Sequence, residues 1–456
     1  MGLSQQKKRK KSSSLSVSLR ASIVDGCFYT TMVGFGESFF NAYVVALQAS
    51  NFVIGLIGSL PQTMGSLAQL LSIQIVHFFK SRKKMVTTLV LIQAFLYIPI
   101  TLGMLFPRSL GIVLIGIAIT LYFMLGMVVV PAWIDWMGFL VPPQLRERYY
   151  GWRNGITGFF SLASFLVAGL ILQFMNKRGW LWVGYAILFM LAFVSRIFSF
   201  LYLCKVQDTT APLPHPLSVD LKKGASFSQL RKSSFFPYLM LSVLMNMAVF
   251  ISGPYFNPYM LKELHFSYWT YTYLLAIPML VKALTMPIWG KICDLYGNRN
   301  VLSFSATFLG ILPILWVASS RVEFIAFIQV LSGFLWGAYD LSSFNALYDL
   351  TTERSRMKYS IILNGVNAIS YIAGSLLIGD RLITLIQSLS PHISPYHVVF
   401  LTSGFSRFAI AFFFLPKIPY SKGKYHVSFR HLMWTFSVLT VRGLNWLSLR
   451  AQRKKK

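Results

Sequence analysis

The stretch Gly290-Lys-Ile-Cys-Asp294-Leu-Tyr-Gly297-Asn-Arg299 is a short polar loop between two long apolar blocks, at residues 267–289 and 300–319. Each block has about 20 residues, the length that a helix needs to cross the hydrocarbon core of a bilayer. A polar loop between two such blocks predicts a helical hairpin that crosses a membrane twice. The rest of the chain repeats this pattern.

Apolar blocks run almost without interruption from residue 22 to residue 416 of the 456-residue chain. The chain is 55% hydrophobic and only 12% charged, roughly half the charged fraction of a soluble domain. This composition excludes a disordered chain or a disulfide-stapled secreted domain and argues against a soluble enzyme. We therefore predict an all-α polytopic membrane protein with twelve transmembrane helices, at residues 22–48, 54–79, 85–106, 110–140, 154–175, 180–204, 235–261, 267–289, 300–319, 322–347, 360–380 and 396–416.

A polar, proline-containing stretch between the sixth and seventh blocks predicts a linker that divides the helices into six and six. Within the last 40 residues, Phe429–Leu449 is rich in Leu, Trp and Phe and is flanked by basic residues, which predicts an interfacial helix. The expected organisation is a basic cytoplasmic tail at 1–21, an N-terminal six-helix half at 22–204, a cytoplasmic linker at 205–234, a C-terminal six-helix half at 235–416 and a basic cytoplasmic tail at 417–456.

The basic residues follow this topology. The net charge is +29, and with alternating crossings 33 of the 42 Lys and Arg residues fall on one side and six on the other. Cytoplasmic loops carry such an excess, so both termini are predicted to be cytoplasmic. The same distribution removes the reason to expect nucleic-acid binding and leaves membrane lipids as ordinary partners of these cations.

The two halves carry similar short motifs in the same order. Phe40-Asn41-Ala42-Tyr43 in the first block matches Phe256-Asn257-Pro258-Tyr259 in the seventh, and Asn154-Gly155 in the fifth matches Asn364-Gly365 in the eleventh. Repetition in the same order predicts two parallel six-helix pseudo-repeats, related by an axis along the membrane normal.

The loop quoted above resembles the G-x-x-x-D-x-x-G-x-R signature of the major facilitator superfamily of transporters. Gly290, Asp294, Gly297 and Arg299 occupy the signature positions. The resemblance implies the major facilitator fold and a cytoplasmic gate in which Asp294 and Arg299 pair with each other or bind helix ends. We expect Gly290 to permit a close helix approach and Gly297 a tight turn.

The first half departs from the family pattern. His77 stands where Asp294 stands in the second half, and Lys80-Ser81-Arg82-Lys83-Lys84 replaces the glycine-rich turn. The fourth block lacks a membrane Arg, and the fifth lacks the Gly-Pro motif of the family's drug antiporters. These departures argue against a drug–proton antiporter.

Ionisable residues inside a membrane are costly, so they are the first candidates for function. Glu37 lies in the first block, and the resemblance implies that this helix lines the central cavity. We expect Glu37 to do one of three things there: to accept a proton, to meet a cationic group or to bond to neighbouring helices. Lys282 is expected to neutralise an anionic substrate, to pair with Glu37 or to extend to the membrane surface. Asn41 and Asn257 are expected either to bind substrate or to join helices by hydrogen bonds.

Other charged residues lie near the cytoplasmic ends of their blocks, which favours roles in gating or at helix ends. Asp135, Arg153 and Asp340 belong to this group, with Arg153 as a candidate partner of Asp135. Arg196 and Arg407, in the last helix of each half, are expected to have supporting roles.

The sequence carries no nucleotide-binding loop and no cysteine or histidine cluster with metal spacing, so we predict no enzyme, no cofactor and no metal. A His-x4-Asp match at His215 and Asp220 falls in the short linker. The sequence thus predicts a monomeric secondary active transporter of a small molecule, working by alternating access and linked to protons, in a bacterial inner membrane. The alternative is a polytopic protein that handles lipid, as a flippase or membrane enzyme. The substrate, the direction of transport and the coupling mode stay open.

Overall fold

The computed structural model describes residues 2–141, 146–208, 230–351, 353–389 and 394–419, and every regular element in these ranges is helical. Ten helical segments of the described chain are long and apolar enough to cross a membrane. They coincide with ten of the predicted spans. The predicted spans at 22–48 and 54–79 are helical too but are not among these ten. The all-α prediction is confirmed, and the total of twelve crossings stays a prediction.

The first predicted half contains eleven helical elements within the described residues. They are α1 (Gly2–Phe35), η1 (Glu37–Phe39), α2 (Phe40–Ala46), α3 (Asn51–Gln69), α4 (Ser72–Phe79), α5 (Arg82–Phe95), α6 (Tyr97–Leu102), η2 (Gly103–Leu105), α7 (Arg108–Leu140), α8 (Arg146–Lys177) and α9 (Leu181–Lys205).

The second predicted half has a similar succession of long and interrupted helices. They are α11 (Phe236–Ser252), η5 (Gly253–Tyr255), α12 (Phe256–Pro258), η6 (Tyr259–Glu263), α13 (Tyr268–Tyr296), α14 (Asn298–Phe308), α15 (Ile311–Ala318), α16 (Val322–Asp349), α17 (Glu353–Ile372), η7 (Ala373–Asp380), α18 (Arg381–Leu389), α19 (Pro395–Phe414) and η8 (Leu415–Lys417).

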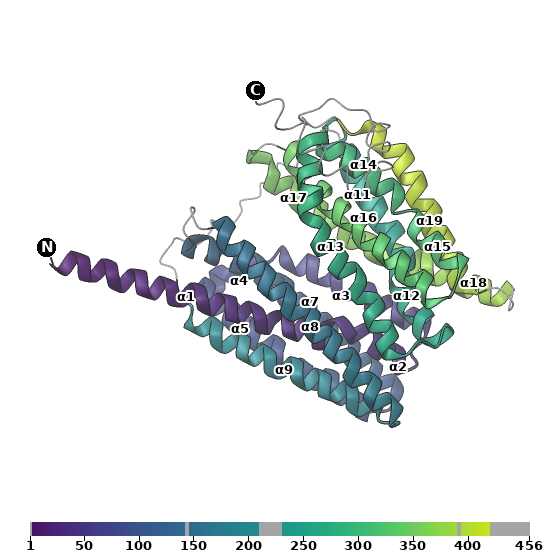
Figure 1. Ribbon diagram of the computed structural model, residues 1–456, viewed down its shortest axis with the longest axis horizontal. Coiled ribbons are helices and arrows are strands. Elements are labelled where there is room, and N and C mark those ends of the chain that lie inside the picture. Colours follow the sequence, from purple (N-terminus) through teal and green to yellow (C-terminus); the bar gives the residue numbers. More distant parts are fainter. Residues whose placement is uncertain (1, 142–145, 209–229, 352, 390–393, 420–456) are drawn as a thin grey trace. The chain divides into compact units, whose positions relative to one another are not determined.

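Internal contacts divide the chain into two compact units. Unit 1 comprises residues 1–225, 246–276 and 361–400, and unit 2 comprises the remaining segments, 226–245, 277–360 and 401–456. In unit 1, α1 packs against α8 and α9, while α7 packs against α3 and α5 (Figure 1). In unit 2, α16 packs against α14 and α15. The units differ from the predicted halves because unit 1 includes η5 and η7, which contact α3. The division into halves therefore stays a prediction.

Small residues allow α1 to lie directly on α8. A Cβ atom on Gly34 would lie 2.8 Å from the carbonyl oxygen of Ser161, so the two backbones are in contact at this glycine. The Thr30 hydroxyl donates a 2.9 Å hydrogen bond to the Thr157 carbonyl one turn away. Close backbone approach and hydroxyl bonds of this kind hold helices together in lipid, where the hydrophobic effect does not.

Some predictions lie outside the described residues. These are the interfacial helix at Phe429–Leu449 and the part of the linker that contains His215 and Asp220.

Candidate functional site

The first predicted span is interrupted at Gly36, beside the candidate carboxyl group of Glu37. α1 ends one residue before Gly36, η1 begins at Glu37, and α2 follows. A Cβ atom on Gly36 would lie 2.6 Å from the ring of Tyr97, so the packing requires glycine here. Glu37 is half-buried, and its Oε2 accepts a 3.0 Å hydrogen bond from the Tyr122 hydroxyl. The break therefore presents a carboxyl group within the first predicted span.

The first span of the second half is interrupted at the matching place. α11 ends at Ser252, η5 covers the next three residues, and α12 begins at Phe256. Both α2 and α12 thus begin at the Phe of the repeated motif, and Asn41 and Asn257 are the second residues of these new helices. Asn41 is half-buried, whereas the Oδ1 of Asn257 accepts a 3.2 Å bond from the Tyr271 hydroxyl. This bond favours the helix-joining role for Asn257.

Buried hydrogen bonds extend from Glu37 into the first half. Tyr122, which bonds to Glu37, accepts a 3.0 Å bond at its backbone carbonyl from Gln93 Nε2. The Oε1 of Gln93 accepts a 3.0 Å bond from Arg196 Nε. The four residues come from η1, α7, α5 and α9, so this chain joins four helical elements of unit 1.

The chain continues from Arg196 to a second carboxyl group. Arg196 Nη1 donates a 3.1 Å bond to the Ser199 hydroxyl, which in turn donates a 2.6 Å bond to Asp25 Oδ1. Arg196 and Asp25 are each only 4% exposed, and the guanidinium lies 4.9 Å from the ring centre of Tyr29. Buried charges need such partners, because an unpaired charge inside the protein costs several kcal/mol. The support that we predicted for Arg196 thus takes the form of these specific bonds.

Asp25 and Gln93 were not among the predicted site residues. Asp25 lies in the first apolar block, and the rule that selected Glu37 would have selected it as well. Gln93 and Tyr122 carry no comparable signal, because uncharged polar residues are common in membrane helices. Their role depends on which residues of other helices face them.

In unit 2, Lys282 of α13 forms an ion pair with Asp340 of α16. The two side chains are 39% and 40% exposed, so the pair is only partly buried. Nearby, Trp289 Nε1 donates a 2.9 Å bond to the Phe334 carbonyl and joins the same two helices. Lys282 is therefore neutralised within its own unit, and an anionic substrate would have to compete with Asp340 to reach it.

The predicted pairing of Asp135 with Arg153 is wrong. Arg82 Nε donates a 2.6 Å bond to Asp135 Oδ2, and the Arg82 side chain is only 2% exposed. Arg153 instead donates a 3.4 Å bond to the Ser22 carbonyl and lies 4.5 Å from the ring centre of Trp133. The reason is geometric, because Arg82 begins α5, which packs against α7, whereas Arg153 bonds to α1. Nothing in the basic run around Arg82 distinguished it from its neighbours.

The loop around residue 297 contains the tight turn that we expected. Gly297 has a φ of +84°, a conformation that side-chain-bearing residues rarely adopt, and α14 begins directly after it. At Gly290, in contrast, no atom of unit 2 approaches the position of a Cβ. The packing within unit 2 therefore gives no reason for glycine at position 290.

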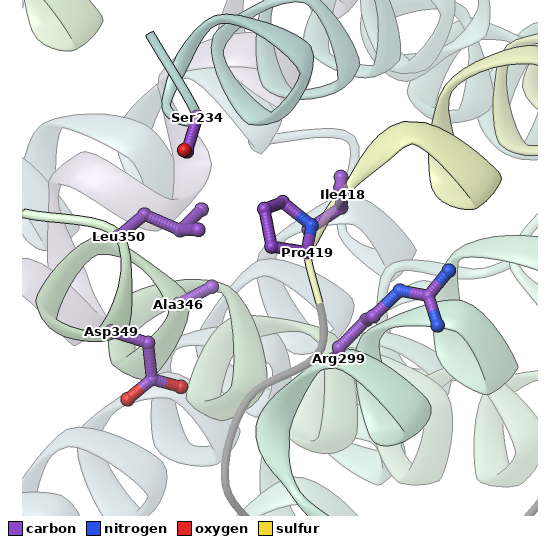
Figure 2. A pocket seen from close by; sticks show the side chains of 7 residues that line it. All are labelled: Ser234, Arg299, Ala346, Asp349, Leu350, Ile418 and Pro419. Carbon is purple, nitrogen blue, oxygen red and sulfur yellow. The ribbon is translucent and has the colours of Figure 1, made fainter.

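Arg299 binds a helix end, which was one of the two predicted alternatives. Its Nη2 donates to the carbonyl oxygens of Leu415 and Pro416, at 3.2 and 3.4 Å. Asp294 is exposed, and the acidic residue that bonds to this loop is Asp349, which accepts a 2.7 Å bond from Asn298. Figure 2 shows Arg299 and Asp349 on opposite sides of a cavity of about 220 Å³, lined also by Ser234, Ala346, Leu350, Ile418 and Pro419.

Within unit 1, α3 is bonded to the last elements of the second half. The Thr63 hydroxyl donates a 2.8 Å bond to the Ala368 carbonyl of α17. The Ser375 hydroxyl of η7 donates a 2.8 Å bond to the Gly55 carbonyl. All four residues belong to unit 1, so these bonds hold the second predicted span to the eleventh.

A family model of the Major Facilitator Superfamily matches residues 239–453 of the chain. No curated protein sequence matches it. Many solved structures share its fold.

Three of these structures illustrate the likeness. The nucleoside transporter NupG is 14% identical, with a TM-score of 0.65 over 90% of this chain and 100% of that one. A D-xylose-proton symporter is also 14% identical, with a TM-score of 0.65 over 90% and 98%. The xylose transporter XylE from E. coli, in an inward open conformation, is 13% identical, with a TM-score of 0.60 over 91% and 98%. At such low identity the likeness establishes the fold alone.

Proposed function

We propose that the chain is a multi-pass membrane transporter of the major facilitator superfamily, and that it moves a small molecule by alternating access, coupled to protons through Glu37. The observation that carries this proposal is the environment of Glu37. The carboxyl group lies at a break in the first span and bonds to the Tyr122 hydroxyl. Among the described residues, no cation lies within ion-pair distance of it.

A carboxyl group in this setting has two stable states. When ionised, it keeps the Tyr122 hydroxyl as donor, because hydrogen bonds to charged acceptors are about twice as strong as neutral ones. When protonated, its own hydroxyl can donate a hydrogen bond instead of only accepting one. Binding and release of a proton at Glu37 would therefore change its bond to α7, the helix that also contacts α3 and α5.

The interrupted first spans supply the conformational part of the proposal. Helix breaks free backbone groups near the middle of a membrane, and transporters place substrate and ion sites at such breaks. Here both halves break just before the repeated Phe-Asn motif. Asn41, four residues after Glu37, is the candidate for a substrate contact on the first half, and Lys282 with Asp340 supplies a displaceable charge pair on the second.

We place the cytoplasmic gate at the two polar junctions that bond the ends of neighbouring helices. In the first half this is the Arg82–Asp135 pair, and in the second it is Arg299 with the carbonyls of η8. Asp294, Gly297 and Gly290 belong to the second junction by sequence. Both junctions would have to change partners or tilt when the cytoplasmic side opens and closes.

A ligand screen by thermal stabilisation of the purified protein tests whether a small-molecule site exists. Ligand at a hundredfold excess over its Kd stabilises the folded state by about 2.7 kcal/mol. We expect one class among sugars, nucleosides, amino acids, peptides and organic acids to stabilise the protein, with an affinity that differs between mildly acidic and neutral pH. Glu37→Gln should abolish the pH difference, whereas Glu323→Gln, at an exposed carboxyl of α16, should keep it. No stabilisation by any class would contradict the proposed transport of a small molecule.

A further inference from the structure

An apolar groove runs between α3 and α7 in unit 1. It has a volume of about 330 Å³ and is lined by Val53, Leu56, Ile57, Leu60, Ile112, Val113, Gly116, Ile117, Thr120 and Leu121. Thr120 is the only lining residue with a polar side chain, and its hydroxyl donates a 2.7 Å bond to the Gly116 carbonyl. The groove therefore offers a ligand no free side-chain hydrogen-bond donor and suits a hydrocarbon chain.

The groove ends in an open cavity of about 550 Å³ at the predicted outer end of both helices. The two spaces share Val53, Ile112 and Val113, so they are continuous. The open cavity is also lined by Ala49, Ser50, Arg108 and Ser109, and neither lining contains Asp or Glu. The Arg108 guanidinium therefore lies at the open end of an apolar groove, and no acidic residue lines either space.

Two cationic side chains, Arg108 and Lys262, lie at this end of the groove. Arg108 donates to the Gln48 carbonyl, and Lys262 Nζ donates a 2.8 Å bond to the next carbonyl, that of Ala49. The two cations are close enough for their charges to interact unfavourably. An anion bound beside Arg108 would offset this repulsion, and the exposed guanidinium has further N–H groups that can donate to it.

The length of the groove also suits a lipid. Residues 112–121 of α7 rise about 14 Å along the helix axis at 1.5 Å per residue. One leaflet contributes about half of a hydrocarbon core that is about 30 Å thick. A chain that starts at Arg108 and follows the groove would reach close to the middle of the membrane.

We propose that the α3–α7 groove is a binding site for an anionic glycerophospholipid, with one acyl chain in the groove and the phosphate at Arg108. The site is separate from Glu37 and does not depend on the transported molecule. Arg108 bonds to the Gln48 carbonyl, and Lys262 of η6 bonds to the Ala49 carbonyl beside it. The headgroup would therefore lie next to the contact between η6 and the loop that precedes α3.

Native mass spectrometry of the intact protein tests this site. The detergent-solubilised protein is incubated with phosphatidylglycerol or with phosphatidylcholine of the same acyl chains, and the retained lipid is counted. Wild type should retain phosphatidylglycerol in preference. Arg108→Gln should lower this retention about fivefold, the factor expected for one cation near an anionic headgroup, and leave phosphatidylcholine unchanged.

Two further variants separate the groove from general surface charge. Gly116→Leu should lower retention of both lipids, because a Cβ on Gly116 would lie 3.6 Å from Ile57 without a clash while the larger side chain fills the groove. Arg321→Gln, at the matching exposed position before α16, should behave as wild type. The proposal is overturned if Arg108→Gln and Arg321→Gln retain lipid equally. It is also overturned if Gly116→Leu, folded by its unfolding temperature, retains lipid as wild type does, or if inorganic phosphate displaces the lipid.

Discussion

Arg196→Met would remove the cation that joins Asp25 to Gln93 inside the first half. Both charged side chains are 4% exposed, and Arg196 donates bonds of 3.0 and 3.1 Å to Gln93 and Ser199. Removing one partner of a buried charge pair costs about 3–5 kcal/mol, because the other charge stays in a medium of low dielectric. We expect a loss at the lower end, about 3 kcal/mol, because the Ser199 hydroxyl lies between the two charges and keeps a bond to Asp25.

The assay is denaturant unfolding of the purified protein in detergent, for Arg196→Met, Asp25→Asn and the double variant. The double variant lacks both charges, so we expect it to be more stable than the sum of the single losses by about 1–2 kcal/mol. Arg321→Met removes an exposed cation and should unfold as wild type does. Two results would refute the reasoning: wild-type stability of Arg196→Met, or strict additivity of the two single changes.

Three further changes test the local geometry by the same unfolding measurement and by hydrogen exchange. Gly297→Ala should destabilise the protein by about 1 kcal/mol or more, because φ is +84° there, whereas Gly290→Ala should be close to neutral; equal effects would contradict the turn assignment. Arg82→Gln should cost about 1.5 kcal/mol, because it removes a charged hydrogen-bond donor from the partly exposed Asp135; a near-neutral effect would show that the pair is not formed. Thr63→Val should speed hydrogen exchange in α3 by about fivefold, because it removes a bond worth about 1 kcal/mol to α17; unchanged exchange would count against that bond.

The sequence predicts the helices well and their interruptions poorly. Blocks of apolar residues are enough to place ten membrane-length helices, because the bilayer requires continuous internal hydrogen bonding over about 20 residues. The breaks at Gly36 and Gly253 are not visible in the hydropathy, because both lie within apolar blocks. The repeated Phe-Asn motif was the indirect sign of these breaks, since each copy begins a new helix after one of them.

The candidate site was predicted in part. Glu37 and Lys282 could be selected because ionisable residues in apolar blocks are few, and Asp25 satisfied the same rule. The partners could not be selected in this way. Asp135 has several basic residues within reach of its helix end, and only the packing of α5 on α7 identifies Arg82 as its partner. The same holds for the gate loop. The motif identified Arg299, but it did not identify the carbonyl groups to which Arg299 bonds.

The most direct test of the account is uptake of the ligand found by the stabilisation screen into proteoliposomes under an imposed pH gradient. Wild type should accumulate the ligand above its external concentration. Glu37→Gln should still exchange labelled for unlabelled ligand but should not accumulate it, because the amide cannot take up a proton, and Glu323→Gln should accumulate it as wild type does. Accumulation by Glu37→Gln at the wild-type level would contradict the claim that Glu37 couples protons to transport.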